Sequence, residues 1–232
     1  YFDRIMKKNR NKLGFPILGI FLLGGAILLS SWLIQNPEDN GWGVYKGDEK
    51  STSYSAFDQI NLSNVSQLQN AWTFQMNDVP QGEQPLSSQS NPIIVDGVMY
   101  ANSGKQWVYA INAQTGKQLW AFKALADGEP TAASRGVTYW AKGEDKRILY
   151  SAGNYLLAIN AKTGKLIPTF GQNGKINLNV GVRDNPAKIS VTLTTPGSIF
   201  KDLIIIGSRL PDFYGAAPGY IRAYHCKTGK LA

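Results

Sequence analysis

The side chains with the most direct catalytic or metal-binding chemistry are scarce in this sequence. It has one histidine, His225, and one cysteine, Cys226. A single histidine excludes a metal centre built from several imidazoles, and a single cysteine excludes an internal disulfide. A Ser-His-Asp site could use only His225, which lies in a strand of the repeat described below. We therefore interpret His225 as a strand side chain and find no nucleophile–base pair for a hydrolase.

The formal net charge of +8 could indicate a nucleic-acid partner. Much of the excess lies within residues 1–12, however, and the remaining positive charges are scattered. No basic stripe is present, so the sequence predicts no nucleic-acid binding. The basic residues of that first stretch are Arg4, Lys7, Lys8, Arg10 and Lys12.

A short motif occurs three times and indicates the framework on which any functional site must lie. It reads Tyr109-Ala-Ile-Asn-Ala-Gln-Thr-Gly-Lys-Gln-Leu-Trp120, then Ala158-Ile-Asn-Ala-Lys-Thr-Gly-Lys-Leu166 and Ala223-Tyr-His-Cys-Lys-Thr-Gly-Lys-Leu231. In each copy an apolar strand runs into a turn whose glycine takes a positive φ at no steric cost. Several short strands per repeat are typical of β-propeller blades. Trp120 offers a flat face to bury between neighbouring blades.

Composition and pattern agree with an all-β protein. The chain is 43% hydrophobic and 17% charged, which favours a folded domain over disorder, and 11% aromatic residues suit strands. We predict a strand at 70–76 and three units of short strands within 92–232. The predicted strands of these units are 92–95, 98–101, 107–112 and 117–122; then 135–140, 148–152, 155–160 and 165–170; then 189–193, 203–207 and 220–224.

A membrane segment is predicted before the propeller. Residues 13–34 carry no charge and follow the basic residues 1–12, which we interpret as a cytoplasmic leader. A helix of this length spans a bilayer core. An uncleaved anchor and a cleaved signal peptide both fit; the lack of an Ala-x-Ala site favours the anchor. The positive-inside rule then places the propeller, after a linker at 35–40, across the inner membrane in the periplasm.

The strand units do not make a complete ring. Propellers close radially and typically have about four to eight blades. We count about three blades and part of another over residues 41–232, and the last repeat stops before the strand that would complete it. We therefore interpret the sequence as the N-terminal part of a longer protein. A short protein that closes by oligomerising is the alternative.

The repeat resembles the tryptophan docking motif of the quinoprotein dehydrogenases, which hold pyrroloquinoline quinone (PQQ) in an eight-bladed propeller. It is also similar to blades of outer-membrane assembly lipoproteins and kinase sensor domains, which bind no quinone. Three further stretches resemble the dehydrogenases, the last of them in their glucose-type group. They are Tyr54-Ser-Ala-Phe-Asp-Gln-Ile-Asn61 with Asn64-Val65 and Ala71-Trp72, Arg135-Gly-Val-Thr-Tyr-Trp140, and Ala217-Pro-Gly-Tyr-Ile-Arg-Ala-Tyr224.

The resemblance implies a PQQ site on the propeller axis. Arg135 matches the family arginine near the quinone oxygens, and Thr194 a hydroxyl donor to a cofactor carboxylate, with Thr195 as the alternative. Ser208 matches another polar contact, and Gln89 falls where relatives carry a Glu or Gln facing the cofactor. The alternatives are a surface ion pair for Arg135, hydroxyls that cap turns for Thr194 and Ser208, and a solvated amide for Gln89.

This chain departs from the family pattern at several positions, which limits the site residues that can be assigned from the resemblance. The alcohol-oxidising branch has adjacent cysteines shortly before the arginine, where this chain has Thr131-Ala-Ala-Ser134. That branch also has a calcium-binding Glu after the Ser208 position, where Arg209-Leu210 follows here. The resemblance implies Ca2+ beside PQQ, but most calcium ligands and the aspartate base are expected beyond Ala232. We therefore assign no catalytic residue and leave the metal ligands unknown.

Two functions remain open at this point. The resemblance implies a periplasmic PQQ-dependent dehydrogenase that oxidises a glucose-like sugar or another alcohol and passes electrons to a membrane quinone or a cytochrome. The alternative is a non-enzymatic propeller that acts as an anchored scaffold or outer-membrane assembly factor.

Overall fold

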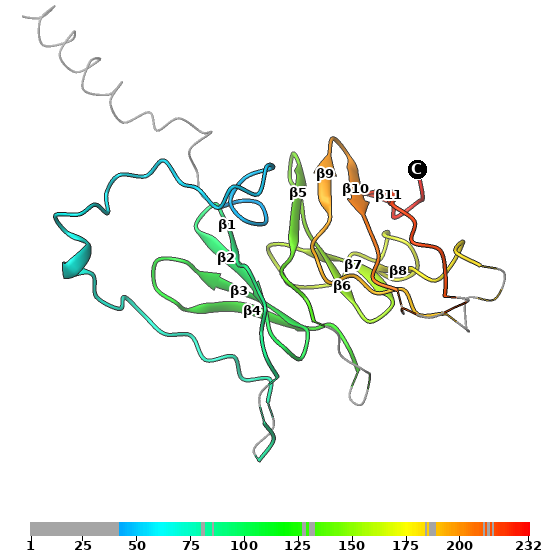
Figure 1. Ribbon diagram of the computed structural model, residues 1–232, viewed down its shortest axis with the longest axis horizontal. Helices are drawn as coiled ribbons and strands as arrows, with labels where there is room; N and C mark the ends of the chain where they lie inside the picture. The colour runs from blue at the N-terminus through cyan, green and yellow to red at the C-terminus, as the bar shows by residue number, and fades with distance from the viewer. Residues whose placement is uncertain are drawn as a thin grey trace, which may run out of the picture. The chain divides into compact units, whose positions relative to one another are not determined.

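The computed structural model describes residues 42–232, except 80, 81, 85, 127, 128, 130–132, 184, 186–188, 211, 213 and 215 (Figure 1). The chain divides into two units, and the described residues belong to the second, Gly41–Ala232. The leader, the predicted membrane segment at 13–34 and the linker lie outside the described residues. Within the described ranges, no helix has the length and apolar composition that crossing a bilayer requires.

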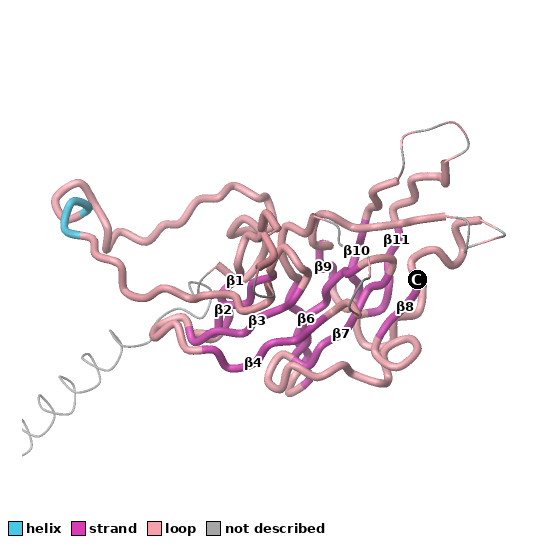
Figure 2. Tube along the Cα trace, turned by 90° about the horizontal axis from the view of Figure 1, so that it is seen from below, coloured by secondary structure: helices cyan, strands magenta, loops and turns pink. Residues whose placement is uncertain are grey.

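The described residues form three antiparallel sheets, which confirms the all-β prediction. Two sheets have four strands, in the spatial orders β1-β2-β3-β4 and β5-β6-β7-β8, and the third has the order β11-β10-β9. Helix in the described part is limited to the 3-10 turn η2, Val65–Gln67 (Figure 2). The strands are β1 Ile93–Val95, β2 Val98–Asn102, β3 Trp107–Asn112, β4 Gln118–Lys123, β5 Thr138–Lys142, β6 Asp145–Ala152, β7 Tyr155–Asn160, β8 Lys175–Asn177, β9 Ser198–Phe200, β10 Leu203–Ile206 and β11 Arg222–His225.

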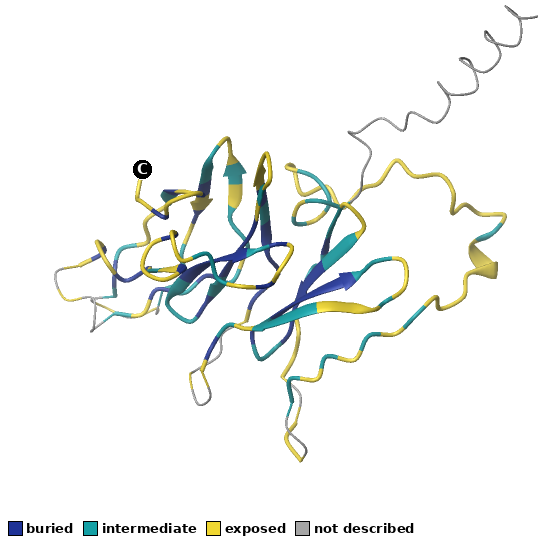
Figure 3. Cartoon of the chain, turned by 180° about the vertical axis from the view of Figure 1, so that it is seen from behind, coloured by how far each residue is buried: buried dark blue, intermediate teal, exposed yellow. Residues whose placement is uncertain are grey.

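The second sheet is buried on both faces because the other two sheets pack against it. Along β6, Ile148 and Tyr150 belong to the core shared with the first sheet, whereas Leu149 belongs to the core shared with the third. On β7, Leu157 and Leu156 divide in the same way. This alternation is the two-residue period of a strand, and it explains the uninterrupted apolar residues at 148–150 of β6 and 155–159 of β7. Figure 3 shows these strands as largely buried.

Tryptophan docking joins the turn of each of the first two repeats to a tryptophan that precedes it in the sequence. A Cβ on Gly116 would lie 2.6 Å from the Trp72 ring, and one on Gly164 would lie 2.7 Å from Trp120. Both glycines have positive φ, so each turn needs glycine for its conformation and for the close approach. The indole N–H groups donate to the carbonyls of Ala113 and Ala161, at 3.1 and 2.9 Å. Local sequence and inter-sheet packing therefore agree at this motif.

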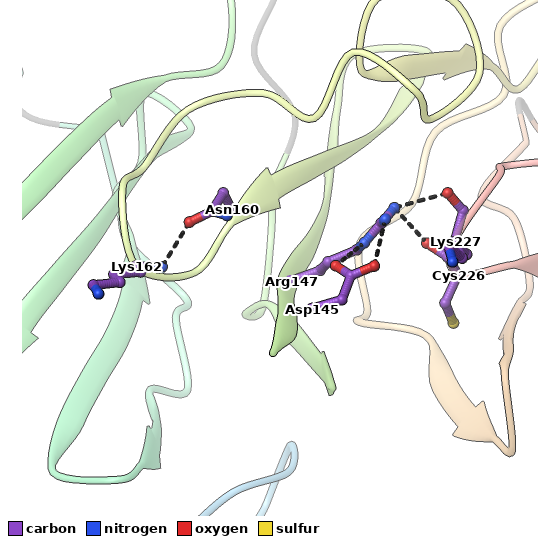
Figure 4. Close-up of polar contacts among 6 residues, drawn as sticks. All are labelled: Asp145, Arg147, Asn160, Lys162, Cys226 and Lys227. Atoms are coloured by element: carbon purple, nitrogen blue, oxygen red, sulfur yellow. Dashed lines mark hydrogen bonds and ion pairs between the residues drawn. The ribbon is translucent and has the colours of Figure 1, made fainter. Parts of the chain in front are cut away.

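The third repeat docks by a different device. The second repeat has Pro168 where the first has Trp120, and Arg147 supplies the donor instead. Its Nη1 donates to the carbonyls of Cys226 and Lys227 at 3.1 and 2.8 Å, and its Nε and Nη2 donate to Asp145 at 2.7 and 2.8 Å (Figure 4). Arg147 is only 3% exposed. A buried guanidinium from β6 thus supplies the hydrogen bond to Cys226 O that an indole supplies to the matching carbonyls of the first two repeats.

Three strand predictions were wrong. Residues 165–170 form only a bridge from Leu166 to Ile159, because Pro168 cannot donate to a ladder; β8 takes the fourth place instead. Residues 189–193 form only a bridge from Thr192 to Arg209, and β9 begins the third sheet after Pro196. Residues 70–76 alternate in burial as a strand does but belong to no described sheet.

Candidate functional site

The segments that lead into the first strands of the three sheets lie side by side. The backbone N–H of Asn91, before β1, donates to the carbonyl of Arg135, before β5, at 2.8 Å. The N–H of Arg135 donates in turn to the carbonyl of Thr194, before β9, also at 2.8 Å. Strands β5 and β9 contact each other (Figure 1). In a propeller, the first strands of neighbouring blades face one another around a central channel. The segments that lead into these strands are therefore the candidate location of a site.

Arg135 and Thr194, which are far apart in sequence, meet through their side chains. Arg135 Nη1 donates to Thr194 Oγ1 at 3.3 Å. Arg135 is exposed and Thr194 is half-buried. It is Thr194, rather than the neighbouring Thr195, whose hydroxyl lies at the guanidinium. A guanidinium has five N–H donors, so one bond to Thr194 leaves donors for an anionic ligand.

Gln89 and Ser208 lie in segments that neighbour this pair. The Gln89 carbonyl accepts from Asn91 Nδ2 at 3.4 Å, and the Gln89 side chain is exposed. Ser208 precedes Arg209, whose backbone N–H donates to Thr192 O at 2.7 Å. The segment with Ser208 therefore lies next to the segment with Thr194. Its hydroxyl donates to Tyr220 O at 3.4 Å, which is the turn-capping role given as the alternative. The structure thus joins Arg135 and Thr194 directly and places Gln89 and Ser208 in segments that are hydrogen-bonded to theirs, with no side-chain hydrogen bond between the two pairs among the described residues.

Gly136 permits the close packing of these segments. A Cβ at this position would lie 2.9 Å from the carbonyl oxygen of Asn91, and the φ of Gly136 is +150°. Any larger residue would push the segment before β1 away from Arg135. The glycine after Arg135 therefore has a packing reason as well as a place in the motif.

A buried polar cluster behind Arg135 was missed at the sequence level. Asn102, Gln106, Ser134 and Tyr150 are each at most 8% exposed. Asn102 Nδ2 donates to Ser134 O at 3.2 Å, and Gln106 Nε2 donates to the carbonyl of Ser151 at 3.4 Å. The sequence Asn102-Ser-Gly-Lys-Gln106 is indistinguishable from an ordinary polar turn between two strands, and only its burial separates it from one.

Burial sets the electrostatics of this cluster. It raises the pKa of the Tyr150 phenol, and the nearby Ser134 and Gln106 side chains oppose that shift. Tyr150 therefore stays protonated at neutral pH, and the cluster carries no charge of its own behind the exposed Arg135 guanidinium. Arg135 therefore brings positive charge to this edge without a buried charge behind it to oppose it.

Other candidate sites are weaker. A pocket of about 320 Å3 is lined by residues 75–79, 86, 88 and 103–105, none of which is a predicted site residue. Among the residues that the structure describes, no three His, Cys, Asp or Glu side chains come together as a metal site.

The residues of the candidate site fit a flat, oxygen-rich anion such as PQQ. They offer a cation at Arg135, a hydroxyl at Thr194, and the close approach of three backbone segments that Gly136 allows. Guanidinium and hydroxyl groups are the donors that carboxylates and quinone oxygens need.

Residues 42–232 match the family model described as the glucose/ethanol/alcohol dehydrogenase β-propeller domain. The similar curated proteins include the quinate/shikimate dehydrogenase (quinone) of Acinetobacter baylyi, 31% identical over 82% of this chain. The quinohemoprotein alcohol dehydrogenase of Comamonas testosteroni is 33% identical over 82%, and the quinoprotein glucose dehydrogenase of Escherichia coli is 30% identical over 83%. The chain spans about a quarter of their lengths, namely 27%, 24% and 26%.

Solved structures agree with these matches. The crystal structure of the Comamonas testosteroni quinohemoprotein alcohol dehydrogenase superposes with a TM-score of 0.65 at 30% identity, over 83% of this chain and 26% of that one. A europium-containing methanol dehydrogenase superposes with a TM-score of 0.62 over 84% of this chain and 31% of that one; at 21% identity it supports the fold alone.

Proposed function

Because the chain belongs to the glucose/ethanol/alcohol dehydrogenase β-propeller family, we propose that the full-length protein containing it is a PQQ-dependent dehydrogenase of a glucose-like sugar or another alcohol. The observation that carries the proposal is the Arg135–Thr194 contact at the inner edge of the sheets. The homologues of this chain are PQQ-dependent dehydrogenases with different substrates, so experiment must decide between a sugar and another alcohol.

Each predicted residue has a role in holding the cofactor. Arg135 would donate to an oxygen of bound PQQ, and its positive charge would favour negative charge on that ligand. Thr194 both orients the Arg135 guanidinium and offers its own hydroxyl. Gln89 would supply a neutral amide donor, and Ser208 would offer a hydroxyl oxygen as an acceptor, because its proton is donated to Tyr220 O. When bound, PQQ supplies the two-electron redox chemistry that no side chain of this chain offers.

The remaining parts of the proposal follow from the family and from the basic N-terminal sequence. Ca2+ accompanies PQQ, with ligands mostly outside this chain. Residues 13–34 anchor the protein in the inner membrane, with the propeller in the periplasm. Electrons pass to a membrane quinone or a cytochrome. The non-enzymatic scaffold is not favoured, since the family model and the relatives named above are those of dehydrogenases.

The test is reconstitution of the full-length protein with PQQ and Ca2+, followed by dye-linked oxidation of glucose, ethanol and quinate. We expect PQQ binding at micromolar cofactor and turnover of at least one substrate. The Arg135→Ala variant should bind PQQ about 10- to 100-fold more weakly, as expected for the loss of a charged hydrogen bond. Lys142→Ala removes an exposed cation at the opposite end of β5 and should leave affinity unchanged.

Two results would overturn the proposal. One is a wild-type protein that binds no PQQ at micromolar concentration. The other is an Arg135→Ala protein with wild-type affinity, because the guanidinium would then not contact the cofactor.

A further inference from the structure

We infer that Asn102 is a positioning residue for Arg135 and acts through the carbonyl of Ser134. The inference rests on the proposed function, since its consequence is measured as PQQ affinity. Asn102 ends β2 in the first sheet, whereas Arg135 precedes the first strand of the second sheet, so the contact crosses between sheets.

The backbone around Arg135 is held by three hydrogen bonds from three directions. Its N–H donates to Thr194 O, and its carbonyl accepts from Asn91 N–H. The third bond is the one from Asn102 Nδ2 to the carbonyl of Ser134, at 3.2 Å. The first two bonds come from neighbouring segments that themselves have exposed residues. The third comes from a side chain that is 1% exposed, so its donor is shielded from competing water.

Asn102 is itself fixed in place. Its N–H donates to Ser90 Oγ at 3.1 Å, and its carbonyl accepts from Ser88 Oγ at 3.3 Å. These bonds tie the end of β2 to the segment that carries Gln89. Asn102 therefore connects the two sides of the candidate site, the Gln89 segment and the Arg135 segment, from behind.

The unused atom of the side chain shows what Asn102 is needed for. Its Oδ1 is buried and has no hydrogen-bond partner among the described residues. A buried polar atom without a partner is costly, so an apolar residue would be favoured here if packing alone decided. What asparagine offers here is its amide N–H2, which donates to Ser134 O at 3.2 Å and to the adjacent Ser103 O at 3.4 Å; of the two bonds, only the one to Ser134 O crosses between the sheets. Aspartate has nearly the same shape but, when ionised, no donor.

The experiment measures PQQ affinity by fluorescence quenching in the full-length protein. Asn102→Ala and Asn102→Asp should each weaken PQQ binding by about 10- to 100-fold, as do changes to residues that orient a ligand-binding group. In the Arg135→Ala background, Asn102→Ala should cause no further loss, because the guanidinium it orients is gone. This non-additivity separates positioning from a general structural effect.

The matched control is Asn112→Ala. Asn112 is also a strand-end asparagine, and its Oδ1 accepts from Gln114 N–H and Thr115 N–H in the turn at the opposite end of the sheet. This variant should lower the melting temperature and leave PQQ affinity unchanged. Wild-type affinity in Asn102→Ala, or equal losses with and without Arg135, overturns the inference but leaves the proposed function standing. No PQQ binding by the wild-type protein overturns the proposed function itself.

Discussion

Replacing Arg147 by methionine should expose Cys226, because Arg147 docks the third repeat onto the second sheet. Four donor–acceptor contacts disappear together, two to Asp145 and one each to the carbonyls of Cys226 and Lys227. Cys226 is fully buried, and burial raises the pKa of its thiol to about 12. The thiolate is the reactive form, so alkylation at neutral pH requires local opening of this region.

The magnitude follows from the burial of the two charges. Removing one partner of a buried ion pair typically costs about 3–5 kcal/mol. The Asp145 side chain is 31% exposed and can be partly rehydrated. We therefore expect a cost somewhat below that range, about 2–3 kcal/mol. At about 1.4 kcal/mol per factor of ten, the rate of Cys226 labelling should rise about 30- to 150-fold. Peptide mass spectrometry assigns the label to Cys226.

The effect should also depend on pH with a defined sign. Hydrogen bonding by Arg147 lowers the pKa of Asp145. A carboxylate with a depressed folded pKa stabilises the fold above its unfolded value of about 3.9, and this contribution is lost as the pH falls below that value. The ratio of variant to wild-type labelling rates should therefore shrink as the pH falls from about 5 to about 3. 4,4′-Dithiodipyridine reacts with thiols over this range.

The neighbouring residue provides the control. Lys146 forms an ion pair with Asp96 in which both side chains are about half exposed or more, and such pairs contribute little. Lys146→Met should leave Cys226 labelling unchanged. An Arg147→Met labelling rate within threefold of wild type would falsify the docking role of Arg147.

Three further predictions concern the docking turns and the site. Gly164→Ala should destabilise the fold by about 1–3 kcal/mol more than Gly143→Ala, since both glycines have positive φ but only a Cβ on Gly164 would meet Trp120, at 2.7 Å; melting temperatures test the order. Trp120→Phe removes the bond to Ala161 O and should cost about 1 kcal/mol in urea unfolding; an unchanged midpoint would contradict this. Arg135→Lys keeps the charge but loses the planar fork, so PQQ affinity by titration should fall between wild type and Arg135→Ala.

The hairpins and docking turns could be predicted because their causes are local. The Thr-Gly turn, the alternation of apolar residues and the strands β3 and β7 follow from residues within a few positions of one another. The strand prediction at 165–170 was wrong because it followed the pattern of the first repeat and gave too little weight to Pro168, which cannot donate a ladder hydrogen bond. The fourth place in that sheet went to β8, a segment with a weaker apolar pattern.

The sequence could predict the candidate ligand-binding residues, but not the buried residue that holds them in place. Arg135 and Thr194 came from resemblance to a family, and their contact at 3.3 Å joins them. Asn102 had no such signal, because a polar residue at the end of a strand is ordinary in sequence. Its burial and its bond to Ser134 O exist only once the first and second sheets pack together.

By itself, the sequence determined an all-β chain of short hairpins, the glycine turns that dock on tryptophan, and a likeness to proteins that bind PQQ. Tertiary structure decided which donor completes each docking site, with Arg147 in place of an indole, and which buried side chain lies behind Arg135. The physical reason is range. Turn conformation and strand periodicity act between near neighbours in sequence, whereas the desolvation of Arg147 and Asn102 depends on partners about 30 to 80 residues away.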